Sequence, residues 1–226
     1  MNSKMQPDWR QVMMAPDEIK LINTALNTRS DVVMLEWGSG ASTTYFSYFT
    51  KQYFSIEHNE EWVNKVTADI KSRDLDNISY KFVPPCKEFA KPKNHRDPAY
   101  RGTPGAYFEK YIDAVESFSE GGQARPIFDV VLVDGRARAH CAVKVLPFLK
   151  PDSTLFIHDF YNRKQYYDVF DYYDEVTGVK HTPQTLVQLA PKSKEQQPHP
   201  ELLTKVHSAR EISKILGRSH DEFEWR

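Results

Sequence analysis

Short apolar runs alternate with amphipathic segments five times along this chain, and this alternation constrains the fold more than any other feature. Each run is flanked by turn-forming or polar residues, as strands of a buried sheet are. The connections are long enough for right-handed crossovers between parallel strands. The predicted class is therefore α/β, with a doubly wound, mostly parallel sheet. Its first five strands are expected at residues 31–36, 53–57, 78–83, 128–133 and 154–157.

Two further strand candidates follow, near residues 174–180 and 184–189. The turn between them, at 181–183, is too short for a crossover, so the two strands should pair antiparallel at one edge. The complete sheet would then have seven strands.

The chain divides by composition into three parts. Residues 1–15 are polar and irregular and are expected to form an N-terminal arm. Residues 16–190 hold the whole α/β pattern and form one domain. Residues 191–226 begin with a charged stretch rich in proline and glutamine, which indicates a linker, and continue into a C-terminal helix and tail.

The net charge of −1 for 226 residues excludes the basic field that general nucleic-acid binding needs. Cys86 and Cys141 are far apart and belong to no Cys-x-x-Cys pair, which disfavours a disulfide framework and a structural zinc site. The first 14 residues contain no signal-peptide run, and no stretch approaches the roughly 18 apolar residues of a membrane helix. We expect a cytoplasmic protein without nucleic-acid or membrane partners. Its oligomeric state is open, and a homodimer is one option.

A carboxylate followed by two closely spaced glycines ends the first predicted strand. Gly38 and Gly40 let the backbone turn tightly and approach a ligand without a Cβ clash. A dinucleotide-binding loop expects a third glycine where this chain has Thr43, and Glu36 would repel a diphosphate. Glu36 suits a cationic group instead, such as the amino group of a methionine moiety. Glu57 ends the second strand, where it can accept hydrogen bonds from ribose hydroxyls.

This Glu-x-Gly-x-Gly sequence, with an acid at the end of the second strand, resembles the motif of Rossmann-like (class I) methyltransferases that use S-adenosylmethionine (SAM). The resemblance covers about residues 30–190 and implies the methyltransferase fold with SAM as methyl donor. The donor-binding residues that it implies are Glu36, Gly38, Ser39, Gly40, Ser42, Thr43, Glu57, Asp134 and Gly135.

Polar residues at the ends of the fourth and fifth strands are the candidates for catalysis. Asp134 follows the fourth strand, and His158 and Asp159 end the fifth, so the three should meet at one rim of the sheet. In one interpretation Asp134 and Asp159, with or without His158, hold Mg²⁺ or Mn²⁺, which would lower the pKa of vicinal hydroxyls. This pattern is similar to catechol and macrocin-type O-methyltransferases, although His158 stands where they usually carry an acid. In the other interpretation no metal is bound, and His158 or Asp159 is the general base.

Four more residues are candidates for binding the acceptor. Arg136, Arg138 and Arg163 follow the same strand ends and could bind an acidic or phosphorylated group; solvated surface is the alternative for each. Tyr107 could form an aromatic wall, with core packing as the alternative. The proline-rich segment 84–125 around it is longer than most loops of a compact domain, so we expect a lid over the acceptor.

The acceptor itself is indicated only by family resemblance. Residues 134–137 lack the Asn/Asp-Pro-Pro-Tyr/Phe sequence of many amino-methyltransferases. The motifs Glu-Trp-Gly-Ser-Gly-x-Ser-Thr, Val-Asp-Gly-Arg and His-Asp-Phe resemble poorly characterised methyltransferase domains and, more remotely, glucuronoxylan O-methyltransferases. That resemblance implies transfer to a hydroxyl of a sugar, in a glycan or a glycosylated metabolite. Three alternatives are methylation of phenolic or polyketide small molecules, a nicotinamide-dependent oxidoreductase and a SAM-binding module without catalysis.

Overall fold

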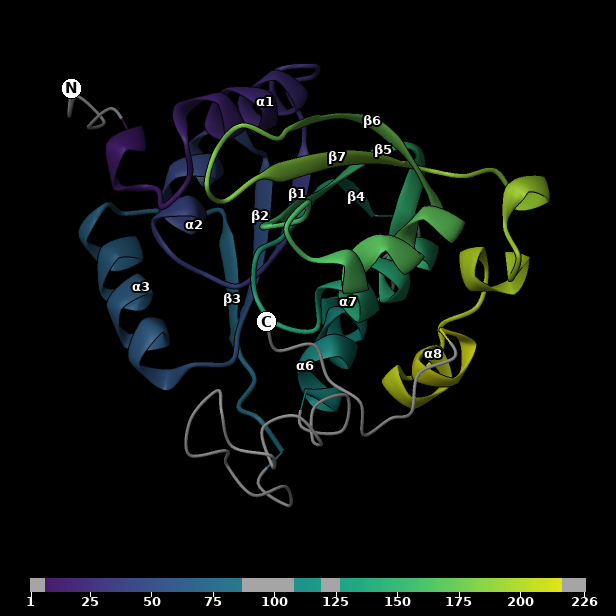
Figure 1. Ribbon diagram of the computed structural model, residues 1–226. Coiled ribbons are helices and arrows are strands. Elements are labelled where there is room, and N and C mark those ends of the chain that lie inside the picture. Colours follow the sequence, from purple (N-terminus) through teal and green to yellow (C-terminus); the bar gives the residue numbers. More distant parts are fainter. Residues whose placement is uncertain (1–6, 87–107, 119–126, 217–226) are drawn as a thin grey trace.

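Seven strands form one sheet in the order β3-β2-β1-β4-β5-β7-β6 (Figure 1). The structure is a computed structural model that describes residues 7–86, 108–118 and 127–216. The strands are β1 (Val33–Trp37), β2 (Gln52–Glu57), β3 (Ile78–Phe82), β4 (Phe128–Val133), β5 (Leu149–His158), β6 (Tyr173–Val179) and β7 (Leu186–Pro191). The predicted seven-stranded α/β sheet is confirmed.

Strands β1 to β5 are mutually parallel, and β7 runs antiparallel to both of its neighbours, β5 and β6. The chain builds outward from β1 through β2 to β3 and then returns to place β4 on the other side of β1. The strand order therefore reverses between β1 and β4. In open α/β sheets this reversal is where ligands bind, beyond the carboxyl ends of the strands.

Helices cover both faces of the sheet (Figure 1). Apolar residues of α1 and α2 pack on one face, and those of α6, α7 and α8 belong to a second cluster on the other. The helices are α1 (Pro16–Leu26), α2 (Ala41–Phe46), α3 (Glu60–Ser72), α6 (Glu109–Asp113), α7 (Arg138–Lys144) and α8 (Ala209–Ile215). Short 3-10 helices are η1 (Trp9–Gln11), η2 (Ser47–Phe49), η3 (Ala114–Phe118), η4 (Leu146–Phe148), η5 (Lys164–Asp171), η6 (Lys194–Gln196) and η7 (Pro200–Leu203).

The central strands are apolar on both faces because each face packs against helices. In β1, Met34 belongs to the cluster under α1 and α2, whereas Leu35 belongs to the cluster on the opposite face. In β4 the same alternation separates Val130 and Leu132 from Val131 and Val133. Successive side chains of a strand point to opposite faces, so two buried faces require a continuous apolar run.

The two ends of the domain are more firmly packed than composition indicates. Val12 and Met14, expected in an irregular arm, are buried in the cluster beneath α1. In the segment after β7, Leu202, Ala209 and Ile212 are buried in the main core. A few apolar residues among many polar ones are enough to pack a short segment against neighbouring helices. So few apolar residues form no recognisable pattern in the sequence.

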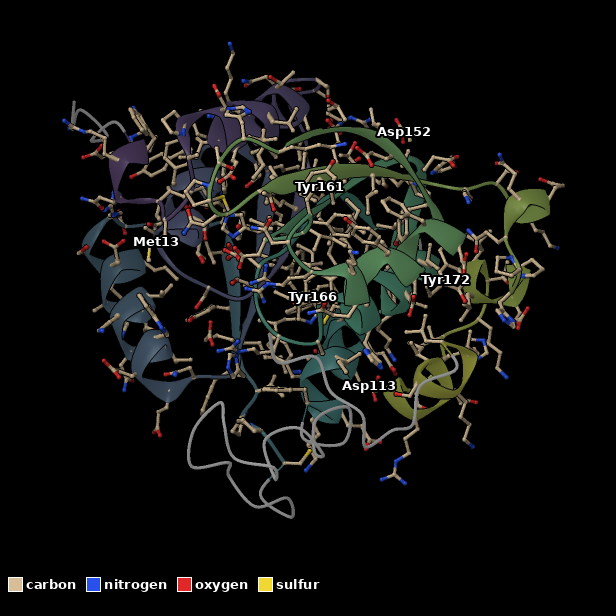
Figure 2. All side chains as sticks on the ribbon, in the orientation of Figure 1. Met13, Asp113, Asp152, Tyr161, Tyr166 and Tyr172 are labelled. Atoms are coloured by element: carbon tan, nitrogen blue, oxygen red, sulfur yellow. The ribbon has the colours of Figure 1, made fainter. Side chains whose placement is uncertain are left out.

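Polar contacts fasten the C-terminal segment to α6 and α7. The backbone N–H of Ala209 donates to Asp113, which Figure 2 shows between α6 and α8. The ammonium group of Lys144, on α7, is fully buried; it pairs with Asp113 at 2.6 Å and with Glu116 at 2.5 Å and also donates to the carbonyl of His207. The segment therefore forms part of the folded domain.

Several predictions concern parts of the chain that the structure describes incompletely. Of the proposed lid, 84–125, residues 87–107 and 119–125 lie outside the described residues, and Tyr107 is among them. The part between them, residues 108–118, is packed in the core. Among the described residues, none of the helices has the length and apolar character needed to cross a membrane. Cytoplasmic location stays a prediction.

Candidate functional site

Four polar strand ends meet at the point where the strand order reverses. Trp37, at the end of β1, is in register with Ile56 of β2 and with Val133 of β4. Val133 is in turn in register with Ile157 of β5. The residues that follow these positions therefore lie at one level along the edge of the sheet, as the sequence predicts for a ligand site.

Gly38 is required by the packing of the β1 and β4 ends. Its φ is +94°, a conformation that side chains rarely adopt. A Cβ atom there would lie 2.5 Å from the backbone nitrogen of Gly135 and 2.8 Å from the carbonyl carbon of Asp134. The two strand ends can approach this closely only because position 38 carries no side chain. Gly38 therefore serves the architecture of the site.

Gly40 differs from Gly38 in a way that points to a ligand. Its φ of −178° is open to any residue. A Cβ atom there would meet only the Ser42 hydroxyl, at 3.8 Å, and otherwise open space. Neither packing nor conformation explains a glycine at this position. The open space beside this partly exposed backbone would let a ligand approach closely.

Glu36 is a buried anchor of the glycine loop rather than an exposed ligand. The side chain is fully buried, and its carboxyl group accepts hydrogen bonds from Ser42 at 2.5 Å, Thr43 at 2.6 Å and Ser55 at 2.9 Å. Burial raises the pKa of Glu36 to about 7, against the effect of the three hydroxyl donors. Thr43 also accepts from the backbone N–H of Gly40, so Glu36 holds the loop in shape through the first turn of α2. The predicted direct contact with a ligand amine is not available to a group so enclosed.

Glu57 fastens the same loop from β2. One carboxylate oxygen accepts from both the backbone N–H and the hydroxyl of Ser39, at 2.7 and 2.9 Å. The other accepts from the backbone N–H groups of His58 and Asn59. Burial alone would raise the pKa of Glu57, but the bonds from His58 and the backbone lower it below its usual value. A ribose hydroxyl could reach this carboxylate only by replacing the Ser39 hydroxyl, which has a second partner in Tyr80 at 2.6 Å.

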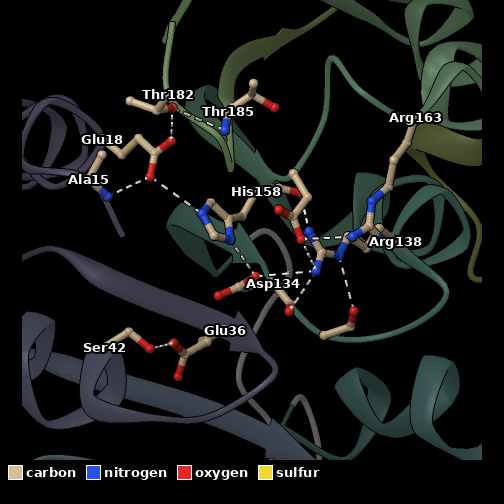
Figure 3. Close-up of polar contacts among 12 residues, drawn as sticks. Ala15, Glu18, Glu36, Ser42, Asp134, Arg138, His158, Arg163, Thr182 and Thr185 are labelled. Carbon is tan, nitrogen blue, oxygen red and sulfur yellow. Dashed lines mark hydrogen bonds and ion pairs between the residues drawn. The ribbon is translucent and has the colours of Figure 1, made fainter. Parts of the chain in front are cut away.

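The predicted catalytic residues do come together, at the ends of β4 and β5 (Figure 3). Asp134, His158 and Asp159 offer side-chain atoms that lie within 4.8 Å of one another. Nδ1 of His158 is 2.8 Å from Oδ1 of Asp134. Nη2 of Arg138 lies 3.3 Å from the Asp134 carboxylate and 3.2 Å from that of Asp159, which also pairs with Arg163 at 3.0 Å. Cations and anions thus alternate through the cluster.

His158 is a buried cation in this arrangement. Its other ring nitrogen, Nε2, lies 3.4 Å from Oε2 of Glu18, an ion-pair distance without the alignment of a hydrogen bond. Burial alone would lower the pKa of His158, but Asp134 and Glu18 raise it to about 9. The imidazole therefore stays protonated at neutral pH. A protonated ring cannot take up a proton, which disfavours His158 and favours Asp159 as the general base.

Arg138 is a structural cation, not the acceptor-binding residue that its position indicated. Its side chain is only 6 % exposed. It donates to the backbone carbonyls of Gly135, Asp134 and His158 as well as pairing with two carboxylates. The planar guanidinium, with five donors, suits such a site better than any other side chain. Each nitrogen of the Arg138 guanidinium already has a partner within the protein, which makes a structural role the better explanation of this side chain.

The cluster does not fit a divalent cation well. A metal between Asp134 and Asp159 would have to share both carboxylates with Arg138, whose charge already neutralises them. His158 would have to lose its proton first, because only a neutral imidazole binds a metal. Arg138 supplies positive charge at the place where a metal was predicted.

Asp159 of the cluster and Ala137 beside it hold left-handed backbone conformations. Asp159 has φ of 54°, and Ala137, which precedes α7, has φ of 52°. The left-handed region costs a side-chain-bearing residue roughly 1–2 kcal/mol. Such conformations gather at functional sites, where the surrounding structure holds them in place.

The remaining predicted residues are less informative, and one important residue was missed. Arg163 pairs with Asp159 and keeps a quarter of its side chain exposed, and Arg136 is partly exposed. Tyr107 lies outside the described residues. The missed residue is Glu18, an acid in the first turn of α1. Acids are common in the first turn of a helix, and nothing in the local sequence shows that Glu18 contacts His158.

Comparison with known proteins supports the fold. No family model matches the chain, and no curated protein matches it. Among solved structures, a methyltransferase-like protein from Silicibacter pomeroyi is similar, with a TM-score of 0.57 and 23% identity over 83% of this chain and 90% of that one. A tRNA (m1A58) methyltransferase from Aquifex aeolicus has a TM-score of 0.55 and 16% identity, over 81% and 71%.

A third similar structure was solved with a ligand. It is a Streptococcus mutans protein assigned as a methyltransferase, in complex with SAH, with a TM-score of 0.51 and 12% identity over 79% of this chain and all of that one. These likenesses show that the chain has the α/β fold of class I methyltransferases.

Proposed function

We propose that the protein binds SAM at the loop after β1 and transfers its methyl group to an acceptor. The observation that carries this proposal is Gly40, which has an ordinary conformation and open space above it in a loop that two buried acids hold rigid. The likeness to a structure solved with SAH adds support at the level of the fold. When bound, SAM would supply an electrophilic methyl group on its sulfonium.

The same loop argues against a nicotinamide dinucleotide. Thr43 replaces the third glycine of a dinucleotide loop, and its hydroxyl is committed to Glu36 and to the N–H of Gly40. A carboxyl group with a pKa of about 7 lies directly beneath the turn that would receive a diphosphate. Thermal shifts measured separately with SAM and with NADH distinguish the two donors: we expect a shift with SAM alone.

The substitution Gly40→Ala tests the donor site without disturbing the fold. The new methyl group has room, so the free energy of unfolding should change by less than about 1 kcal/mol. It would occupy space that the ligand needs, so we expect the Kd for SAM to rise at least about tenfold. Equilibrium dialysis with labelled SAM measures the Kd, and urea denaturation measures stability. Unchanged binding by a stable Gly40→Ala variant would contradict the proposed donor site.

For the acceptor, we propose a hydroxyl group, with a sugar of a glycan or a glycosylated metabolite as the first candidate and a phenolic or polyketide molecule as the second. Family resemblance supports this choice. Transfer forms a bond from the acceptor oxygen to the methyl carbon, breaks the carbon–sulfur bond and releases the hydroxyl proton. The Asp159 carboxylate is the candidate that receives this proton, since His158 is already protonated.

The substitution Asp159→Asn tests the catalytic assignment. An amide keeps the size of the side chain but cannot receive a proton, so we expect kcat to fall by about 10²–10⁴-fold while the Kd for SAM stays within about twofold. The assay follows the label from methyl-labelled SAM into sugars, glycosides and phenols tried as acceptors. An Asp159→Asn variant that turns over at the wild-type rate on the acceptor so found would remove Asp159 from the mechanism.

A further inference from the structure

Glu18 is an acid buried at the candidate site although it comes from outside the sheet edge. It lies in the first turn of α1, and its side chain is fully buried. Figure 3 shows its carboxylate between three partners. Oε2 accepts the backbone N–H of Ala15 at 2.8 Å and faces Nε2 of His158 at 3.4 Å, while Oε1 accepts the hydroxyl of Thr182 at 2.6 Å. One carboxylate thus joins α1, β5 and the turn between β6 and β7.

The environment of His158 explains why this contact matters. Asp134 faces Nδ1 from the end of β4, and Glu18 faces Nε2 from α1. Asp159, next in the chain, pairs with Arg138, and Arg138 also donates to the backbone carbonyl of His158. The imidazole therefore lies between two carboxylates, one facing each ring nitrogen. An imidazole ring can rotate about its bond to Cβ, and a partner at each nitrogen restricts that rotation.

We propose that Glu18 is a positioning residue of the transfer site: by facing Nε2 it fixes the His158 ring so that Nδ1 holds the Asp134 carboxylate at the end of β4. This inference rests on the proposed function. Glu18 itself touches neither donor nor acceptor and acts only through His158. Asp134 is the more exposed partner, with 24% of its side chain accessible against none for Glu18, so fixing the ring fixes the carboxylate that a ligand can meet.

A purely structural role for Glu18 is the competing explanation, and the chain offers a matched control. The bonds to Ala15 and Thr182 cap α1 and tie down the turn before β7 without involving His158. Thr182→Val removes the bond to Glu18, and the bond from the N–H of Thr185 to the same hydroxyl, and leaves the contact with His158. Glu18→Gln keeps a carbonyl oxygen for Ala15 or Thr182 but removes the charge that faces the ring.

The kinetic test separates positioning from stability. In the Glu18→Gln variant we expect kcat to fall at least about tenfold while the Kd for SAM and the KM for the acceptor stay within about twofold. Thr182→Val should keep kcat within about twofold even if it lowers the unfolding temperature. In a His158→Asn background, Glu18→Gln should have no further effect on kcat, because the ring through which it acts is gone. A full kcat in Glu18→Gln, or equal effects in both backgrounds, would overturn the inference.

A second readout does not depend on turnover. In protein labelled with ¹⁵N-histidine, the His158 ring signals are identified by their loss in His158→Asn. Glu18→Gln should shift both ring nitrogens of His158, whereas Thr182→Val should leave them unchanged. Unshifted signals in Glu18→Gln would overturn the inference even in an active methyltransferase. Shifted signals in a protein that neither binds SAM nor transfers methyl groups would support the contact and refute the proposed function.

Discussion

Replacing Arg138 by methionine is expected to lower the free energy of unfolding by about 3 kcal/mol or more. Removing one partner of a buried ion pair costs about 3–5 kcal/mol, because the remaining charge is left without compensation. Here two carboxylates lose one of their two cationic partners, and three carbonyls lose a donor. Asp134 and Asp159 keep about a quarter of their side chains exposed, so water compensates in part and the lower end of the range applies. Urea denaturation measures the loss.

The matched control is Arg163→Met. Arg163 also pairs with Asp159, at 3.0 Å, but a quarter of its side chain is accessible to solvent, so water can replace this partner and we expect a smaller loss of about 1 kcal/mol. Arg138→Lys should fall between the two variants, because an ammonium keeps the charge but lacks the planar fork. A loss in Arg138→Met no larger than in Arg163→Met would show that Arg138 does not hold the site together.

Gly38→Ala is expected to be the second severe change, with a loss of about 2–6 kcal/mol. Alanine at position 38 would have to adopt a φ near +94°, and its methyl group would lie 2.5 Å from the backbone nitrogen of Gly135. The backbone strain and the steric clash each cost about 1–3 kcal/mol. The backbone cannot move aside easily. The N–H of Gly38 donates to Ile56, and the N–H of Asp134 donates to Trp37, so any shift breaks hydrogen bonds of the sheet.

Gly40→Ala is the control for this substitution, two residues along the same loop. It adds the same methyl group in a position where nothing is closer than 3.8 Å. The two variants should therefore separate stability from binding: Gly38→Ala loses both, and Gly40→Ala loses binding alone. Equal unfolding free energies for the two, measured in urea, would mean that the β1 and β4 ends are not packed as described.

The positions of the strand ends could be predicted from the sequence because each strand is a continuous apolar run that stops at a polar residue or a glycine. In a parallel sheet all carboxyl ends share one edge, so Gly38, Glu57, Asp134 and His158 had to meet there. The antiparallel pair near the end of the chain followed from its short turn. These features depend on local sequence patterns and on the order of the elements, both of which can be recognised in a sequence.

The roles of several residues depend on contacts that no local pattern encodes. Glu36 and a ligand-facing acid look alike in sequence, and only the three hydroxyls around Glu36 show that it is committed to the protein. Arg138 looks like a surface arginine until Asp134 and Asp159 are seen on either side of it. Glu18 and His158 are far apart in the sequence, and their contact depends on the complete fold.

Calorimetric titration of the wild-type protein with S-adenosylhomocysteine is the most direct test of the claim that the loop after β1 binds the methyl donor. We predict saturable binding with one site per chain and no binding of NADH under the same conditions. The absence of any binding of S-adenosylhomocysteine by the folded protein would contradict the proposed function.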